Sequence, residues 1–204
     1  MQTIIIDNFL PYPNIIRQWA LNQQYLNDKE YTAKIDKTTT WPGVRTEHVM
    51  ELDMDYANVV LGRFVNYVNT LYPNPGKVVN TVQSYFQLCS AADGDSWVHQ
   101  DNCVFAAGIL YLSPNPPPDS GTILYRCKDL RKWNSLHISD MMKINRLEKK
   151  DLYDSLFEPI DSIGNVYNRL VIYSGDAFHK SNNYFGSNRE DSRLTQVFFA
   201  KTEQ

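Results

Sequence analysis

Two side chains that can bind a metal ion stand two residues apart in the segment SWVHQDNCVF, residues 96–105. They are His99 and Asp101. The segment otherwise has the composition of a strand, and residues two apart along a strand point to the same side. The imidazole and the carboxylate are therefore expected to face one space, which is either solvent or something that both bind.

A third candidate ligand lies far along the chain. His179, in LVIYSGDAFHKSNN, follows a predicted strand and precedes a polar loop. Two histidines and one carboxylate form the facial triad that holds Fe(II) with open positions. An H-x-D pair alone is usually a solvated pair, and a histidine such as His179 alone is usually a loop residue, so only the combination indicates a metal site. The remaining histidines, His48 and His137, have no partners at metal-ligand spacing and are interpreted as structural or exposed.

An arginine and a threonine occupy alternate positions in SRLTQVFFA, the last predicted strand. Arg193 and Thr195 would share one face of that strand. If residues 181–191 form a turn, Arg193 is expected on the strand beside His179. A guanidinium there could bind a carboxylate through two parallel hydrogen bonds. The pattern predicts a site for a dicarboxylate that chelates the metal at one end and meets Arg193 at the other, whereas Arg193 alone would be a solvated strand end.

In this combination the chain resembles the 2-oxoglutarate- and Fe(II)-dependent oxygenases, in their prolyl-4-hydroxylase-like branch. VHQDN, AFHKS and RLT stand in the family's order, and GILYLSPNPPPDSGTILYR has Ser120 and Gly121 where two glycines are usual. The front end, IIIDNFLPYPNIIRQWAL followed by WPGVRT, is similar to small members from phages and bacteria. The resemblance covers most of the chain, and its motifs are specific only together.

The resemblance implies a double-stranded β-helix, or jelly roll, with Fe(II) as cofactor and 2-oxoglutarate and O2 as co-substrates. The expected reaction is hydroxylation or demethylation with release of succinate and CO2, and no catalytic residue beyond the metal ligands is implied. Relatives that halogenate lack the carboxylate that Asp101 supplies here. The implied site residues are His99, Asp101 and His179 for Fe(II), and Arg193, Thr195, Tyr111 and Tyr85 for 2-oxoglutarate, although strand tyrosines are also ordinary core residues.

The remaining sequence predicts a single domain over residues 1–204, mainly β with flanking α. Residues 1–76 read as an N-terminal α/β support, with a helix from Asn14 as N-cap and a second one over DYANVVLGRFVNYVNTLY. Residues 77–204 read as a jelly-roll core of short strands. A helical insertion is expected at about 128–160. Its excess of basic residues fits either a solvated helix face or a lid that steers an acidic substrate.

The totals limit the functional class. A chain of 204 residues with 43% hydrophobic content can bury a core, and a net charge of −3 does not indicate nucleic acid as a partner. No apolar run is long enough for a membrane span, no secretory signal is seen, and the three cysteines form no C-x-x-C pair. These features predict a cytoplasmic protein, with a phage-encoded protein acting in the host cytoplasm as one variant.

Two other functions stay open at this point. One is a cupin-like metal-binding enzyme without 2-oxoglutarate, and the other is a non-catalytic jelly-roll interaction module. For an oxygenase the substrate stays open among a protein side chain, a free amino acid, a nucleobase and a small metabolite. Arg45 in WPGVRT could face the mouth of the site or be an ordinary loop arginine.

Overall fold

The chain folds into two antiparallel β-sheets packed against each other, and the computed structural model describes residues 2–30, 41–71, 78–101, 104–134 and 154–202. The larger sheet has the strand order β1-β7-β4-β9-β3-β2, and the smaller has the order β6-β5-β8. The strands are β1 (Thr3–Ile6), β2 (Val44–Arg45), β3 (Val79–Cys89), β4 (Ala106–Tyr111), β5 (Thr122–Cys127), β6 (Phe157–Ile163), β7 (Leu170–Ser174), β8 (Phe178–Ser181) and β9 (Arg193–Thr202).

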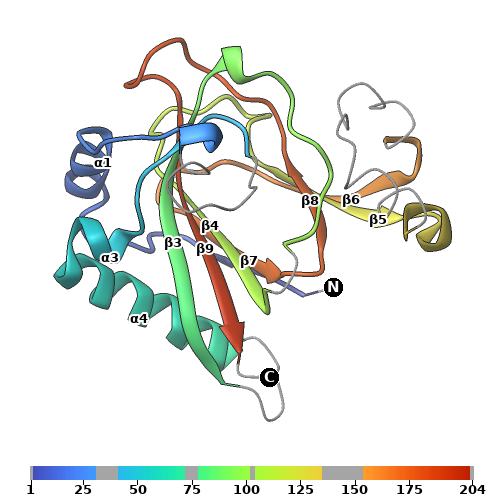
Figure 1. The fold of residues 1–204 in the computed structure, drawn as a ribbon, viewed down its shortest axis with the longest axis horizontal. Coiled ribbons are helices and arrows are strands. Elements are labelled where there is room, and N and C mark those ends of the chain that lie inside the picture. The colour runs from blue at the N-terminus through green and yellow to red at the C-terminus, as the bar shows by residue number, and fades with distance from the viewer. Residues whose placement is uncertain (1, 31–40, 72–77, 102–103, 135–153, 203–204) are drawn as a thin grey trace.

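Helices cover the outer face of the six-stranded sheet, on the side away from β5 and β6 (Figure 1). The longest, α4 (Met54–Leu71), buries residues at helical spacing, which are Ala57, Val60, Phe64 and Val68. The others are α1 (Pro13–Leu21), α3 (Val49–Leu52) and the short 3₁₀ turn η1 (Ala91–Asp93).

The alternation of side chains along the strands separates this sheet into two faces. On β9, Leu194 and Phe198 pack in the helix-side core, and the ring of Phe198 stacks on Phe64 with centroids 4.6 Å apart. Gly108 on β4 leaves room for that stack, because a Cβ there would lie 2.5 Å from Cε2 of Phe64. The residues at odd positions of β9, which include Arg193, point instead toward the small sheet.

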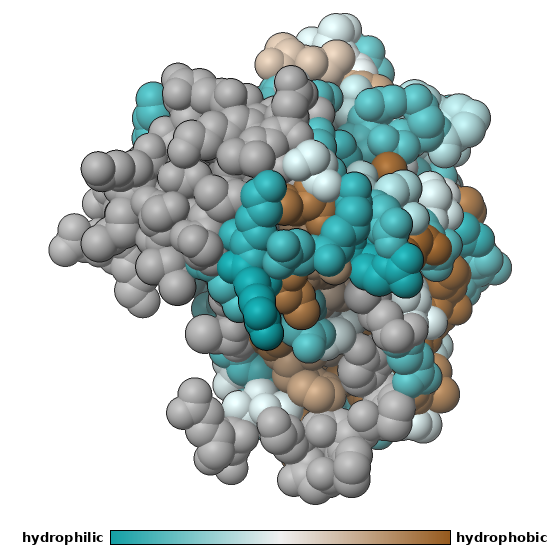
Figure 2. All heavy atoms as spheres, turned by 90° about the vertical axis from the view of Figure 1, so that its right-hand side faces the viewer, coloured by the Kyte–Doolittle hydropathy of each residue, from teal (hydrophilic) through white to brown (hydrophobic). Residues whose placement is uncertain are grey.

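A second core fills the space between the sheets. We call it the inter-sheet cluster, and it combines residues from β4, β5, β6, β7 and β9 with one from the turn before β8: Ala107, Ile109, Tyr111, Leu124, Ile163, Val171, Tyr173, Ala177 and Val197. A smaller cluster, which includes Trp133, Phe157 and Phe178, joins the two described ends of the expected insertion to β8. On the side that carries the small sheet, the visible surface is mostly hydrophilic with scattered hydrophobic residues (Figure 2).

Two local expectations were wrong. Helix α1 begins at Pro13 with Tyr12 as its N-cap, so Asn14 is not the cap; proline suits the first helical turn because its missing N–H would have no partner there. The end of the expected insertion is not helical, since β6 begins at Phe157 and pairs with β5. Residues 130–134 are helical, and the middle of the insertion, 135–153, lies outside the described residues.

The predicted fold class is confirmed, because two antiparallel sheets with flanking helices form the jelly-roll arrangement. Strands β1 and β2 both precede residue 76 and form the two edges of the six-stranded sheet. The N-terminal part therefore contributes strands as well as the helices that cover them. In the described part of the chain, no helix is both long and apolar enough to cross a membrane.

Candidate metal centre

The structure brings the three candidate metal ligands together. His99, Asp101 and His179 each offer a ligand atom, and these atoms all lie within 4.8 Å of one another. Nε2 of His179 is 3.5 Å from Oδ2 of Asp101, and Nε2 of His99 is 4.0 Å from Oδ1 of the same carboxylate. The two imidazole rings have their centroids 4.3 Å apart. The group is half enclosed, since the side chain of His179 is 5% exposed and that of His99 is 33% exposed.

Hydrogen bonds to carbonyl groups fix the orientation of both imidazoles. Nδ1 of His99 lies 3.0 Å from the carbonyl oxygen of Trp97, and Nδ1 of His179 lies 2.9 Å from that of Ala177. A carbonyl oxygen only accepts, so in both rings Nδ1 must carry the proton and donate it. Nε2 is then left as a lone pair that faces Asp101, which is the tautomer that a metal ligand requires.

Backbone contacts bring the two ligand segments into register. The residues His99 and His179 form an isolated antiparallel bridge, with amide-to-carbonyl distances of 3.0 and 2.9 Å. The amide of Asp101 donates to the carbonyl of Gly175 at 2.9 Å. Gly175 is required at this approach, because a Cβ there would lie 2.0 Å from the carbonyl oxygen of Val104. The expected strand over 96–101 is therefore only a single bridge, yet both side chains still face the same space.

Tyr173 connects the triad to the rest of the inter-sheet cluster. Its ring centroid is 4.6 Å from that of His179, and the residue is 1% exposed. Burial raises the pKa of its hydroxyl well above the ordinary value. The charges of Asp101 and Arg193 act on this pKa in opposite directions, so Tyr173 lies within electrostatic reach of both. Sequence reasoning missed Tyr173, although the alternation of β7 could have indicated that it points inward.

Arg193 is buried between the two sheets at 2% exposure. The expectation that it lies on the strand beside His179 was wrong: β8 pairs with β5 in the small sheet, whereas β9 lies between β3 and β4 in the large one. Arg193 thus approaches the interior from the opposite sheet. Its Nε donates to the carbonyl of Ser120 at 3.1 Å, and its guanidinium carbon is 5.5 Å from the ring centre of Tyr111. Among the described residues, its Nη2 is buried without a hydrogen-bond partner.

The other predicted co-substrate residues lie on the same face of the large sheet as Arg193. Thr195 pairs with Tyr111 across β9 and β4, and both are fully buried. The hydroxyl of Tyr111 is 2.7 Å from Oγ1 of Thr122, and burial raises its pKa, so it stays a neutral hydrogen-bonding group. Tyr85 on β3 packs against the same cluster. Sequence reasoning missed Thr122, which belongs to a strand it had predicted.

The corner before β5 needs the glycine that the sequence provides. A Cβ on Gly121 would lie 1.9 Å from the carbonyl oxygen of Ile163 on β6, so no larger residue fits. Ser120 precedes it and supplies the carbonyl that accepts from Arg193. The close approach of this corner to β6 therefore fixes the position of the Ser120 carbonyl, which accepts the hydrogen bond from Arg193.

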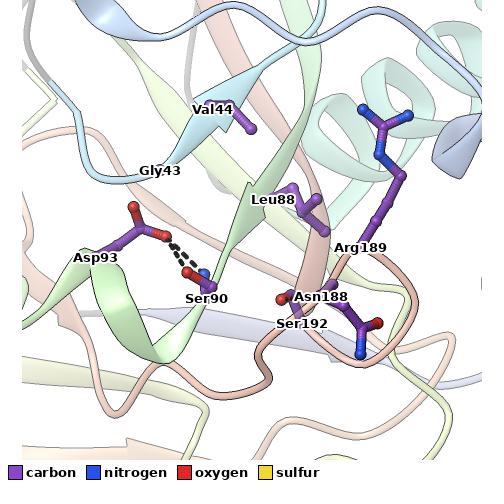
Figure 3. A pocket seen from close by; sticks show the side chains of 8 residues that line it. All are labelled: Gly43, Val44, Leu88, Ser90, Asp93, Asn188, Arg189 and Ser192. Atoms are coloured by element: carbon purple, nitrogen blue, oxygen red, sulfur yellow. Dashed lines mark hydrogen bonds between the residues drawn. The ribbon is translucent and has the colours of Figure 1, made fainter.

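The other candidate features lie apart from this site. His48 is structural as interpreted, because its Nδ1 accepts from the amide of Met50 and its Nε2 lies 3.2 Å from the carbonyl of Val82. His137 lies outside the described residues. A separate pocket between β2, the end of β3 and the loop before β9 contains none of the predicted site residues (Figure 3). Its one arginine, Arg189, donates to the carbonyl of Leu21 at the end of α1.

Comparisons with known proteins identify a family and a shared fold. The family described as "Family of unknown function (DUF6445)" matches residues 1–200. A search of curated protein sequences finds no significant match. Among solved structures, a prolyl-4-hydroxylase of Pseudomonas putida is 14% identical with a TM-score of 0.54, covering 99% of this chain and 93% of that chain.

Two further structures have the same fold. HygX from Streptomyces hygroscopicus, solved with nickel and 2-oxoglutarate bound, is 10% identical with a TM-score of 0.62, covering 98% of this chain and 82% of that chain. SnoN, a non-heme alpha-ketoglutarate-dependent epimerase from nogalamycin biosynthesis, is 9% identical with a TM-score of 0.53, covering 97% of this chain and 76% of that chain. At these identities the likeness establishes the fold, and the function must be argued from the site.

Proposed function

The chain belongs to the DUF6445 family, and we propose that it is an Fe(II)- and 2-oxoglutarate-dependent oxygenase of the prolyl-4-hydroxylase-like branch. It would hydroxylate or demethylate its substrate. In the hydroxylation, one oxygen atom of O2 enters a C–H bond of the substrate and the other enters the succinate formed from 2-oxoglutarate. The keto acid loses CO2 and supplies two electrons, so the reaction balances without another reductant.

The observation that carries this proposal is the buried Arg193. Its Nη2 has no hydrogen-bond partner among the described residues, at a site where water is largely excluded. A neutral donor that is buried without a partner costs about 1–3 kcal/mol of stability, and a charged donor costs more. Such a group therefore indicates that an acceptor binds there. A carboxylate is the acceptor whose geometry matches a guanidinium. This supports 2-oxoglutarate, whose far carboxylate would meet Arg193.

The donor set of the triad fits the proposed metal. Two imidazole nitrogens and one carboxylate oxygen suit Fe(II) and leave coordination positions open for other ligands. The residues that would hold the ion are His99 and His179 through Nε2, and Asp101 through its carboxylate. When bound, Fe(II) supplies the one-electron chemistry that O2 activation requires.

The residues of the chain would bind, orient and enclose the reactants. Arg193 would bind the far carboxylate of 2-oxoglutarate in two-pronged fashion, with the hydroxyls of Thr195 and Tyr111 as additional donors. The inter-sheet cluster excludes water from this end, and Tyr173 packs on His179. Asp101 would supply the carboxylate ligand that a halogenating enzyme lacks, which supports hydroxylation over halogenation.

The two alternative functions differ in what they bind. A cupin-like enzyme would use the same triad but would have no need for a buried arginine facing the interior. A non-catalytic module would need neither the imidazole tautomers nor the carboxylate. No contact in the described part of the chain favours either alternative over the oxygenase.

Anaerobic titration separates the three functions. The proposed oxygenase binds one Fe(II) and then 2-oxoglutarate, and the chelate gives a weak visible charge-transfer band. Admission of O2 then forms succinate. A protein that binds the metal but gives no band and no succinate with 2-oxoglutarate would be cupin-like. A protein that binds neither would overturn the proposal in full.

A further inference from the structure

A second arginine lies on the same face of the large sheet as the candidate site. Arg45 is on the short strand β2 and pairs with Gln87 on β3. Gln87 pairs with Thr195 on β9, which in turn pairs with Tyr111 on β4. These four residues therefore form one row across the sheet, and residues in register point to the same face. Arg45 lies at the edge of the face on which the proposed 2-oxoglutarate residues lie.

Neighbouring side chains hold the guanidinium of Arg45 in place. Its Nε and Nη2 donate to Oε1 of Gln87 at 3.2 and 3.0 Å. The amide nitrogen of Gln87 donates in turn to the carbonyl of Pro42 at 2.8 Å, which fixes the orientation of the amide. The guanidinium carbon lies 4.7 Å from the ring centre of Trp41 and 5.7 Å from that of Phe199. The side chain is thus oriented before any ligand binds.

In the described part of the chain, no anion pairs with the charge of Arg45. Within the described residues, no carboxylate lies within ion-pair distance of it, and its Nη1 makes no hydrogen bond. Burial lowers the pKa of its guanidinium, and the carboxylate that opposes this effect is Asp101, a candidate metal ligand. Since a guanidinium remains charged in proteins, Arg45 retains a positive charge that no described carboxylate pairs with, and this charge lies within electrostatic reach of Asp101.

A path of small and aromatic residues joins Arg45 to the candidate metal centre. Phe199, beside Arg45, pairs with Ala107 on β4, and Ala107 pairs with Tyr173 on β7. Tyr173 contacts the ring of His179. All three lie on the inner face, and the small side chain in the middle separates the two aromatic rings. This row therefore connects the surroundings of Arg45 to the triad along the inner face of the sheet.

We propose that Arg45 binds the anionic group of the substrate, so that the substrate is an organic anion with an apolar portion. A carboxylate or phosphate would take the free N–H groups of Nη1 and Nη2 as a two-pronged pair. The apolar portion would pack between Trp41 and Phe199 and extend toward the triad. This inference rests on the proposed oxygenase function, because it assigns Arg193 to 2-oxoglutarate and leaves Arg45 for the substrate.

Benzoate and benzamide form a matched pair of probes for this site, because they differ in charge and have nearly the same shape. The titrations use the full chain loaded with Ni(II) and saturating 2-oxoglutarate, so that the site of Arg193 is filled and no turnover occurs. Calorimetry should show benzoate binding at least about tenfold more tightly than benzamide, which is the effect of one charge-assisted pair. No benzoate binding, or equal binding of the two probes, would overturn the inference.

Three variants locate the binding. Arg45→Gln should weaken benzoate at least about tenfold while 2-oxoglutarate affinity is unchanged, and Arg45→Lys should restore part of the loss because it keeps the charge without the fork. Arg63→Gln removes an exposed guanidinium that lies over Phe9 on the helix side, and it should bind benzoate like the wild type. Thermal melts check that each variant is folded. Unchanged benzoate affinity in Arg45→Gln would contradict the inference.

The loading step reports separately on the proposed function. If Ni(II) and 2-oxoglutarate do not bind, the oxygenase proposal fails, and benzoate is then titrated into the unloaded protein. If benzoate binding is lost in Arg45→Gln but retained in Arg193→Ala, Arg45 would still be identified as an anion site. If benzoate binding is lost only in Arg193→Ala, benzoate enters the proposed 2-oxoglutarate site, and the proposal that Arg45 binds the anion is contradicted.

Discussion

The two faces of strand β9 have opposite characters. Toward the helices, Leu194 and Phe198 are fully buried in apolar packing. Toward the small sheet, Arg193 and Thr195 are buried just as deeply, but Nη2 of Arg193 has no partner among the described residues and the hydroxyl of Thr195 makes a long contact to the carbonyl of Gln87. Burial of an apolar ring contributes stability, whereas burial of an unmatched guanidinium costs stability. The outer face of β9 thus contributes apolar packing, whereas the inner face adds a buried charge whose Nη2 has no partner in the described part of the chain.

The contrast implies that changes on the two faces should have separable effects. Substitutions on the outer face should lower the free energy of unfolding and leave ligand affinity in the folded protein intact. Substitutions of the polar inner residues Arg193 and Thr195 should lower ligand affinity and leave stability nearly unchanged. If either behaves like an outer residue, its assignment to ligand binding would be weakened.

The largest effect is expected at the candidate metal ligands. His179→Ala removes one of the three ligands, so stoichiometric Fe(II) binding and succinate formation should be abolished while the fold persists. Metal content after anaerobic loading, together with a far-ultraviolet spectrum, measures both quantities. His99→Ala should behave in the same way. Full iron stoichiometry in either variant would show that the triad has been wrongly assigned.

The next effect is expected on the outer face. Phe198→Ala removes a buried ring that stacks on Phe64, and it should lower the free energy of unfolding by about 3–5 kcal/mol. Chemical denaturation measures the loss. At a temperature where the variant is still folded, its affinity for 2-oxoglutarate should equal that of the wild type. A large loss of affinity in the folded variant would mean that the two faces are not independent.

The smallest effect is expected at Thr195. Its hydroxyl lies 3.5 Å from the carbonyl of Gln87, which is a long contact, so Thr195→Val should change the free energy of unfolding by less than about 1 kcal/mol. If the hydroxyl donates to the far carboxylate of 2-oxoglutarate, affinity should fall by about tenfold. Isothermal titration gives the affinity, and an unchanged value would remove Thr195 from the proposed site.

Much of the fold could be predicted from the sequence, because strand alternation and helical spacing are local patterns. The face of α4 with Val60, Phe64 and Val68 follows directly from a period of 3.6 residues. Strand β6 could not be predicted in this way. It contains Pro159 and acidic residues, which disfavour strands, but as an edge strand with a register shift it tolerates them.

The residues of the candidate site could be named from their types and order, but their arrangement could not. Which sheet a strand joins depends on long-range pairing, so the sequence did not reveal that Arg193 approaches from the sheet opposite β8. Alternation could show that Tyr173 points inward but not which residue it contacts, and Arg45 could be interpreted either as a residue at the mouth of the site or as an ordinary loop arginine. Their proximity to the triad and to its neighbours emerges only when β7 and β2 pair with the other strands.

The affinity of Arg193→Ala for 2-oxoglutarate decides whether Arg193 binds this co-substrate. Cutting a pair between a guanidinium and a carboxylate in a partly dry site costs about 2–5 kcal/mol, so anaerobic titration of the Fe(II) protein should show affinity weakened by about thirty-fold or more. Fe(II) affinity should be unchanged, Arg193→Lys should recover part of the loss, and 2-oxopentanoate, which lacks the far carboxylate, should bind poorly to the wild type and variant alike. If Arg193→Ala binds 2-oxoglutarate as tightly as the wild type, the co-substrate assignment is contradicted even if the metal centre is correct.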